Sequence, residues 1–188
     1  MIVGRAGRKA ASDLLARFGS IGRVMSASQE ALSATLGPDH PAIDAIRAAN
    51  TLVRLSFEEQ LVGKSLDASD PLLHHHLRAQ LLCSDVERLY AIFLNHRGLY
   101  LGGELVAVGS RQGLQVSIRA IVHRALDTNA AAILLAHNHP SGDCRPSVRD
   151  IEQTRQLATI LDAIELFLVD HLIVCNQGIY SLEKGKEL

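Results

Sequence analysis

An uninterrupted run of seven apolar residues at 130–136 constrains the fold more than any other feature of the sequence. A membrane-crossing helix needs about 20 such residues, so the run is too short to be one. The run also lacks the polar–apolar alternation of a strand with one wet face, and this is typical of a strand buried on both faces of a sheet. The sequence therefore predicts a central strand here.

Other strand and helix patterns surround this run. Helical spacing of apolar residues occurs at 117–126 and 148–163. Short apolar segments bounded by turn residues, as in strands, lie at 89–94, 99–108, 167–175 and 179–182. Strands that are interleaved with helices predict a layered α/β or α+β fold.

The N-terminal part of the chain has helix signals instead. Three helices are expected around 11–18, 28–36 and 42–53, separated by turns that contain glycine or proline. The polar, turn-rich segment 62–71 predicts a boundary, so we expect a helical module at 1–66 and an α/β domain at 67–188.

Three consecutive histidines, His74, His75 and His76, follow this boundary in a helical stretch. Consecutive residues on a helix point about 100° apart, so these three side chains cannot share one metal ion. They are predicted to be surface residues.

The charge balance argues against a protein that coats nucleic acid. The chain has 19 basic and 20 acidic residues, with a formal net charge of -1. The first 24 residues nevertheless hold five basic side chains against the single acid Asp13: Arg5, Arg8, Lys9, Arg17 and Arg23. Both a weak contact with nucleic-acid phosphates and a solvated helix face fit this excess.

Features of membrane or secreted proteins are missing from the sequence. It has no apolar run of membrane-spanning length and no signal-peptide pattern at its start. The three cysteines are widely spaced, which predicts neither a disulfide framework nor a paired zinc motif. We therefore expect a cytoplasmic protein that does not associate with membranes.

The segment that ends the central strand holds candidate metal ligands. His137 and His139 are two residues apart, so on an extended chain both imidazoles project to the same side. Asp150 follows near the start of the next expected helix. A catalytic zinc site takes three nitrogen or oxygen ligands and leaves a fourth position for water. These three residues are therefore the predicted Zn²⁺ ligands.

Simpler roles for the same residues remain open. Ser147 and Asp150 have the spacing of a capping box, in which the two side chains close the start of a helix. Two histidines around Asn138 are also compatible with a surface loop. The combined pattern is more restrictive than either part, because it fixes five residue types across fourteen positions.

The pattern of His137, His139, Pro140, Ser147 and Asp150 resembles the JAMM signature of MPN/JAB-type zinc metalloproteases. The stretches 129–143, 170–174 and 180–182 look like the bacterial RadC branch of that family. The resemblance covers about 67–188. It implies an MPN/JAB1-like mixed sheet flanked by helices, with the layering of cytidine deaminases, behind a small all-α N-terminal module.

The resemblance also implies a mechanism. Zn²⁺ on His137, His139 and Asp150 would activate a water, and Glu87 just before the first strand would act as general acid/base. Glu104 is the nearby rival for that role. Ser147 would help to stabilise the oxyanion. The implied activity is that of a metalloprotease or isopeptidase that cleaves amide bonds in a protein or peptide substrate.

Two other functions stay open. One is a DNA repair or recombination accessory protein that binds or processes DNA, and the other is a non-catalytic MPN interaction domain. The family's DNA-binding helix–hairpin–helix would correspond to 36–42, where Pro38 and Pro41 lack the backbone N–H groups that contact phosphate. The helical module is therefore expected to be a degenerate version.

Some features keep several interpretations. Exposed strand edges make a homodimer an open expectation. Cys144, in the segment between the predicted ligands, is a candidate fourth, inhibitory ligand or a redox-responsive thiol. His123 and His171 are predicted to be structural.

Overall fold

A computed structural model of the chain describes residues 5–82, 86–109 and 116–188. The chain divides into two compact units, Met1–Ser56 and Phe57–Leu188. The division lies inside helix α4 (Ala42–Leu61), ahead of the boundary predicted after residue 66. The turn-rich segment falls within the second unit, because Leu61, Leu66 and Ala68 belong to that unit's core.

The first unit is helical, as predicted. It contains α1 (Arg5–Phe18), α2 (Ile21–Ser26), α3 (Gln29–Leu36) and the start of α4. One buried residue from each helix builds its core: Leu14, Val24, Leu32 and Ile43. Helix α2 was not predicted, since six residues are too few to show a helical period.

Three junctions join the four helices of this unit. Residues 37–41, which lie within the stretch 36–42 predicted to match the hairpin, connect α3 to α4. The other two are each two residues long: residues 27 and 28 join α2 to α3, and the turn Gly19–Ser20 joins α1 to α2. Gly19 has φ of 81°, which favours glycine, and the Ser20 side chain accepts a hydrogen bond from Arg23 N–H to cap α2.

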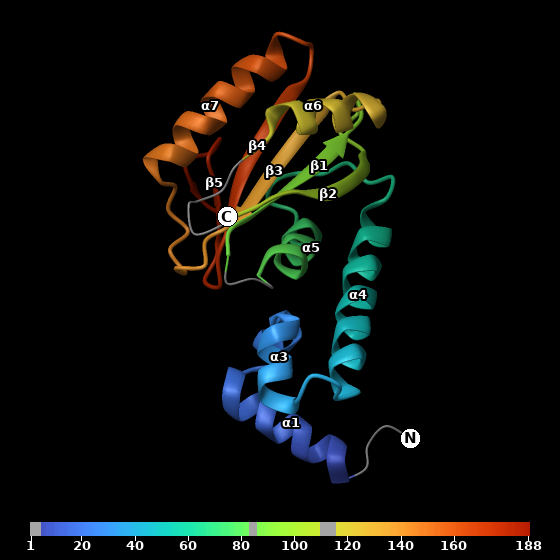
Figure 1. Ribbon diagram of the computed structural model, residues 1–188. Helices are drawn as coiled ribbons and strands as arrows, with labels where there is room; N and C mark the ends of the chain where they lie inside the picture. The colour runs from blue at the N-terminus through green and yellow to red at the C-terminus, as the bar shows by residue number, and fades with distance from the viewer. Residues whose placement is uncertain (1–4, 83–85, 110–115) are drawn as a thin grey trace. The chain divides into compact units, whose positions relative to one another are not determined.

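The second unit is a mixed α/β domain, which confirms the predicted fold class (Figure 1). Its sheet has six strands in the order β2-β1-β3-β4-β5-β6, in which only β3 and β4 are parallel neighbours. The strands are β1 (Arg88–Leu94), β2 (Tyr100–Val108), β3 (Ala132–Asn138), β4 (Phe167–Val174), β5 (Ile179–Ser181) and β6 (Lys186–Glu187). The helices are α5 (Pro71–Leu81), α6 (Ile118–Asp127) and α7 (Val148–Asp162).

Helices cover both faces of this sheet, with α5 on one face and α6 and α7 on the other (Figure 1). Alternate residues of β1 and β3 enter the two cores. Ile92 and Leu134 pack with α5, whereas Phe93, Ile133 and Leu135 pack with α6 and α7. The central strand β3 is thus buried on both faces, as its apolar run predicts.

The prediction that all three adjacent histidines lie on the surface is wrong for His76. Its side chain is fully buried on the core face of α5, with Nε2 3.3 Å from the hydroxyl of Tyr90. His75 is exposed and stacks on Phe57, and His74 is half-buried. Three identical adjacent residues give no difference in polarity along the sequence, so periodicity could not show that one of them is buried.

Strand β2 forms one edge of the sheet. Leu101, Leu105 and Val108 are each at least 42% exposed along it. Edge strands with apolar side chains can pair with other strands, so the homodimer stays a prediction. None of the helices in the described parts of the chain has the length and apolarity needed to cross a membrane.

The expectation that the cysteines are unpaired is also wrong. Cys144, in the loop after β3, forms a disulfide with Cys175, directly after β4, and their Cα atoms lie 5.4 Å apart. Because β3 and β4 are parallel neighbours, the segments that follow their ends meet at the same edge of the sheet. A sequence separation of 31 residues hides this proximity. Cys83 lies outside the described residues.

We expect one cysteine to react with a thiol reagent in the denatured, unreduced protein, and all three after reduction. Cys175→Ser should lower the free energy of unfolding by up to about 3–4 kcal/mol. The reason is that the cross-link, between cysteines 31 residues apart, restricts the unfolded chain. Urea unfolding with and without reductant measures this effect. Equal stability in the two conditions would contradict the pairing.

Candidate metal centre

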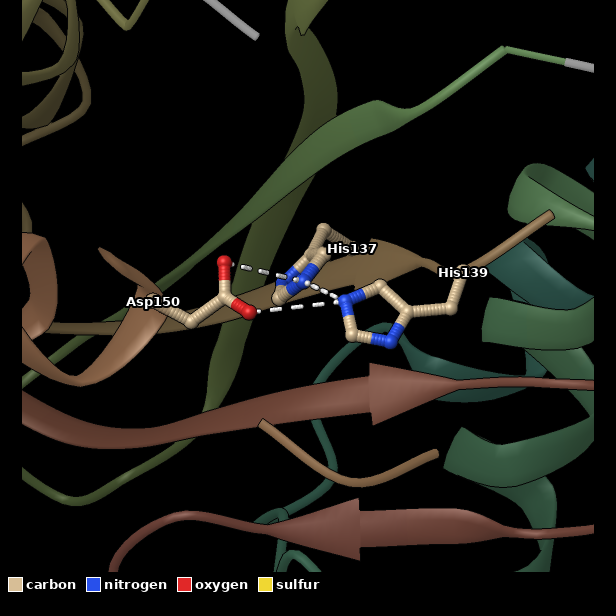
Figure 2. Close-up of side chains that lie close together, drawn as sticks. All are labelled: His137, His139 and Asp150. Atoms are coloured by element: carbon tan, nitrogen blue, oxygen red, sulfur yellow. Dashed lines mark hydrogen bonds and ion pairs between the residues drawn. The ribbon is translucent and has the colours of Figure 1, made fainter. Parts of the chain in front are cut away.

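His137 and His139 lie where the central strand ends, and their rings converge (Figure 2). His137 is the penultimate residue of β3 and is 2% exposed. The backbone N–H of His139 donates to the carbonyl of Val174 at 3.1 Å, so the chain stays beside β4 for one residue beyond the strand. The two Nε2 atoms are 2.9 Å apart.

Asp150 reaches the same point from helix α7. Its carboxylate oxygens lie 3.5 Å from the Nε2 atoms, Oδ1 from that of His137 and Oδ2 from that of His139. The candidate ligand atoms of the three residues all lie within 4.8 Å of one another. The structure thus brings together the three residues predicted as metal ligands, which could hold one ion.

The hydrogen bonds on the far sides of the rings show which nitrogens carry lone pairs. His139 Nδ1 lies 2.7 Å from the carbonyl oxygen of Asp143, which only accepts, so Nδ1 donates, and in the neutral ring Nε2 is left with the lone pair. His137 Nδ1 lies 2.8 Å from Nε2 of His171. Two imidazole nitrogens and a carboxylate facing one point match the ligand types and number of a catalytic zinc site. The residues therefore fit Zn²⁺.

Electrostatics favour the metal-binding protonation states of His137 and Asp150, whereas the hydrogen bond with Asp150 raises the pKa of His139, so that ring must lose a proton to bind a metal ion. Burial, with the neighbouring His171 adding to it, holds the pKa of His137 well below its ordinary value. Although burial opposes the shift, hydrogen bonds from His139 and Ser147 hold the pKa of Asp150 far below its usual range. A neutral imidazole and an ionised carboxylate are the forms that bind metals.

Ser147 and Asp150 form the capping box, so this simpler role is real. Ser147 Oγ accepts from the Asp150 N–H at 3.1 Å and donates to Asp150 Oδ2 at 2.6 Å, while the Ser147 N–H donates to the same oxygen at 2.8 Å. The cap fixes the carboxylate that faces the histidines. A role of Ser147 at an oxyanion stays a prediction and requires its hydroxyl hydrogen to rotate away from Asp150.

Glu87 lies directly before β1, beside the histidines. The antiparallel register ends with Leu89 opposite His137, and continuing it places Glu87, two residues before Leu89, opposite His139, two residues after His137. Its charge contributes to the raised pKa of His139, for which the hydrogen bond with Asp150 is the main cause. The rival Glu104 instead forms an ion pair with Arg124 at 3.0 Å.

Asn138, between the two histidines, holds the backbone on both sides of Glu87. Its Oδ1 accepts from the Arg88 N–H at 2.7 Å, and its Nδ2 donates to the Val86 carbonyl at 3.1 Å. The side chain is 1% exposed. Sequence reasoning gave Asn138 no role, although its place between two predicted ligands was a usable signal.

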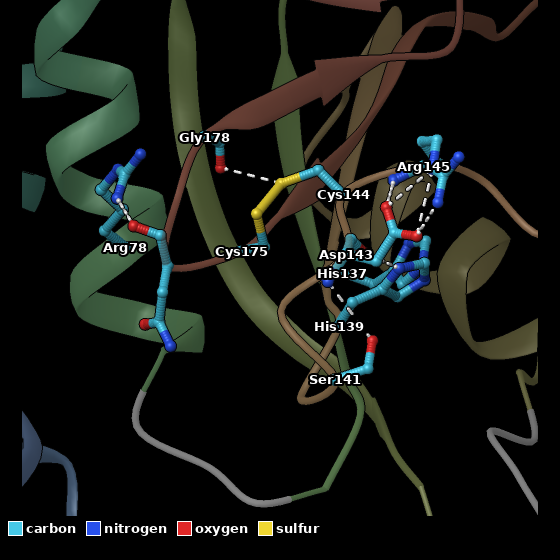
Figure 3. The surroundings of a disulfide bond; sticks show 10 residues. Arg78, His137, His139, Ser141, Asp143, Cys144, Arg145, Cys175 and Gly178 are labelled. Carbon is cyan, nitrogen blue, oxygen red and sulfur yellow. Dashed lines mark hydrogen bonds and ion pairs between the residues drawn. A yellow bond between two sulfur atoms is a disulfide. The ribbon is translucent and has the colours of Figure 1, made fainter.

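The loop from His139 to α7, residues 139–147, is here called the ligand loop. Figure 3 shows the disulfide that Cys144 of this loop forms with Cys175. The Cys144 sulfur is bonded to Cys175, so this structure contradicts the alternative of a fourth, inhibitory ligand. The disulfide joins the ligand loop to the turn between β4 and β5.

His171 was predicted to be only structural, yet it contacts the site. It lies on β4 beside Leu135 of β3, and it hydrogen-bonds to His137 and to Thr154 of α7. Burial is the main cause that lowers the pKa of His171 to about 4. The signal that sequence reasoning missed is the pair of polar residues Asp170 and His171 within a strand that is otherwise apolar.

The low pKa of His171 predicts a loss of stability on acidification in metal-free protein. An unfolded histidine binds a proton near pH 6.5, whereas folded His171 stays neutral down to about pH 4. The unfolded state therefore gains protons first as the pH falls through this window, which costs up to about 3 kcal/mol.

Urea unfolding at pH 7 and pH 4.5, with chelator present, tests this expectation. His139, whose pKa is raised, acts in the opposite direction, so the informative quantity is the difference between wild type and His171→Gln. The variant should lose less stability on acidification. An equal loss in both proteins would refute the assignment.

Known proteins are similar to this chain along most of its length. A UPF0758 protein of Cupriavidus pinatubonensis is 34% identical over 189 residues, covering 99% of this chain and 83% of that protein. UPF0758 proteins of a Marinomonas species and of Pseudomonas fluorescens are 34% and 32% identical, over 87% and 92% of this chain and 73% and 77% of their own. Residues 66–188, which include every residue of the candidate centre, match the RadC-like JAB domain. The chain belongs to the RadC-like JAB domain family.

Proposed function

We propose that this protein is a zinc-dependent hydrolase of the JAMM type that cleaves amide bonds in a protein or peptide substrate. The observation that carries the proposal is the convergence of two imidazole Nε2 atoms and one carboxylate on a single point. Membership of the RadC-like JAB domain family supports it. Zinc bound there would polarise the substrate carbonyl and lower the pKa of a water.

The chain's own residues supply the remaining functions. Glu87 is the proposed proton carrier, taking a proton from the attacking water and returning it to the leaving amine. Asn138 fixes the backbone around Glu87 through its bonds to residues 86 and 88. Ser147 is the proposed hydroxyl donor to the oxyanion, and the cap that it forms keeps Asp150 aimed at the histidines.

Replacing Glu87 should lower the rate of hydrolysis without changing the metal content. Glu87→Gln should keep wild-type zinc, measured by mass spectrometry of protein purified without added metal. It should lower the cleavage rate of a peptide or isopeptide substrate by about 10²–10⁴-fold, because a general acid/base contributes about that much.

Two further variants control this experiment. Glu104→Gln, at the ion pair with Arg124, should keep both zinc and activity. Asp150→Asn should lose zinc. Wild-type protein that carries no zinc and takes up none on reconstitution would refute the proposed function.

A second candidate function is contact with nucleic acid through the first unit. Among the described side chains of helices α1 and α2, four basic ones are exposed: Arg8, Lys9, Arg17 and Arg23. Arg17 and Arg23 flank the Gly19–Ser20 turn. Basic side chains beside a tight turn can neutralise phosphates without reading bases. This contact would position a DNA-associated protein and is compatible with a hydrolase in the second unit.

The double variant Arg17→Gln/Arg23→Gln should weaken binding to labelled duplex DNA in fluorescence anisotropy. Losing two phosphate contacts should reduce the slope of log affinity against log salt by about 2. Arg97→Gln, an exposed arginine of the second unit, is the control and should leave the slope unchanged. No binding by wild type at low salt would remove this candidate.

A further inference from the structure

A chain of hydrogen bonds runs from helix α7 through strand β4 to the candidate metal centre. Thr154 lies one turn after Asp150 on α7, and its Oγ1 is 2.6 Å from the Asp150 carbonyl oxygen. The same Oγ1 is 2.6 Å from His171 Nδ1. His171 Nε2 is then 2.8 Å from His137 Nδ1.

The Asp150 carbonyl determines which atom donates and which accepts in each of these hydrogen bonds. A carbonyl oxygen only accepts, so the single hydroxyl hydrogen of Thr154 points to Asp150. Thr154 Oγ1 must then accept a hydrogen bond from His171 Nδ1–H. In a neutral His171 ring, Nε2 is left as an acceptor, and His137 Nδ1 must donate to it.

This direction determines which nitrogen of His137 carries the proton. With its proton on Nδ1, His137 presents an Nε2 lone pair toward His139 and Asp150. The other tautomer would place a hydrogen at that point and block a metal ion. Because a metal ligand's second ring nitrogen commonly donates to an acceptor that orients the ring, a second histidine can serve as that acceptor.

We propose that Thr154 and His171 are positioning residues that hold His137 in its metal-binding tautomer, an inference that rests on the proposed function. Neither residue lies among the predicted ligands. The series of hydrogen bonds begins at the backbone carbonyl of Asp150. One predicted ligand, Asp150, therefore supplies the group that orients another, His137. One turn of α7 thus supplies the Asp150 carboxylate and, through Thr154, also orients the His137 ring.

A threonine bonded to the carbonyl four residues back is common in helices and often has no further role. Thr159 makes this bond to the Arg155 carbonyl at 2.9 Å on the same helix, where its side chain is exposed. Thr154 differs because its oxygen also accepts from a buried histidine. The two threonines therefore form a matched pair for testing the inference.

Zinc affinity of the purified full chain, measured by competition with a chromophoric chelator, gives the first test. Thr154→Val keeps the side-chain shape and removes the hydroxyl, and it should weaken zinc binding by about 10–100-fold. Thr159→Val should bind zinc as wild type does. Equal affinities of the two variants, both folded by circular dichroism, would overturn the proposal.

Variants of His171 test the acceptor directly. His171→Gln can place an amide oxygen near the position of Nε2 and should retain part of the affinity, whereas His171→Phe fills the space without an acceptor and should lose more. A merely packing role predicts the reverse order, because phenylalanine is the better fit for a buried apolar site. That reverse order would contradict the inference.

Nitrogen-15 NMR of the histidine rings in metal-free protein gives a readout that needs no zinc. Wild-type His137 should show the Nδ1–H tautomer, and Thr154→Val should mix it with the Nε2–H form. His139, which donates to the Asp143 carbonyl, is the internal control and should not change. An unchanged His137 overturns the inference.

The two readouts separate this inference from the proposed function. Wild-type protein that binds no zinc yet shows a tautomer shift in Thr154→Val would contradict the hydrolase and keep the hydrogen-bond chain.

Discussion

The pairing of β3 with a strand on each side is the constraint on which the rest of the structure depends. Its antiparallel pairing with β1 brings the segment before β1, with Glu87, next to the end of β3. Its parallel pairing with β4 places His171 beside Leu135 and brings Cys175 near the ligand loop. A slip of one residue would turn His137 to the opposite face of the sheet. The candidate centre is therefore a product of strand register.

Much of the second unit could be predicted from the sequence, because its strands and helices carry strong local patterns. The apolar run predicted β3, and the spacing of His137, His139 and Asp150 predicted a cluster that the structure contains. Features that depend on contacts between distant segments were missed. The disulfide, the burial of His76 and the contact of His171 with His137 all depend on which strands and helices become neighbours. Local sequence patterns do not determine which strands and helices become neighbours.

The start of helix α7 shows how one local motif serves two purposes. A capping box stabilises a helix by satisfying its first backbone N–H groups. Here the residue that closes the box is Asp150, so helix formation and the orientation of a candidate ligand are the same event. The question of whether Ser147 and Asp150 form a cap or belong to a site therefore has no exclusive answer. The sequence alone left both open, because the motif is identical in the two cases.

Asn138 has a consequence for how the centre can move. Its two neighbours face the metal-binding point, while its own amide is bonded to the backbone on each side of Glu87. The strand end that carries the two histidines is thus hydrogen-bonded, through Asn138, to the segment that carries Glu87. These two segments form one frame. These two bonds oppose a hinge movement between Glu87 and the histidines. If the proposed hydrolase function holds, adaptation to a substrate falls to the ligand loop and the other segments around this frame.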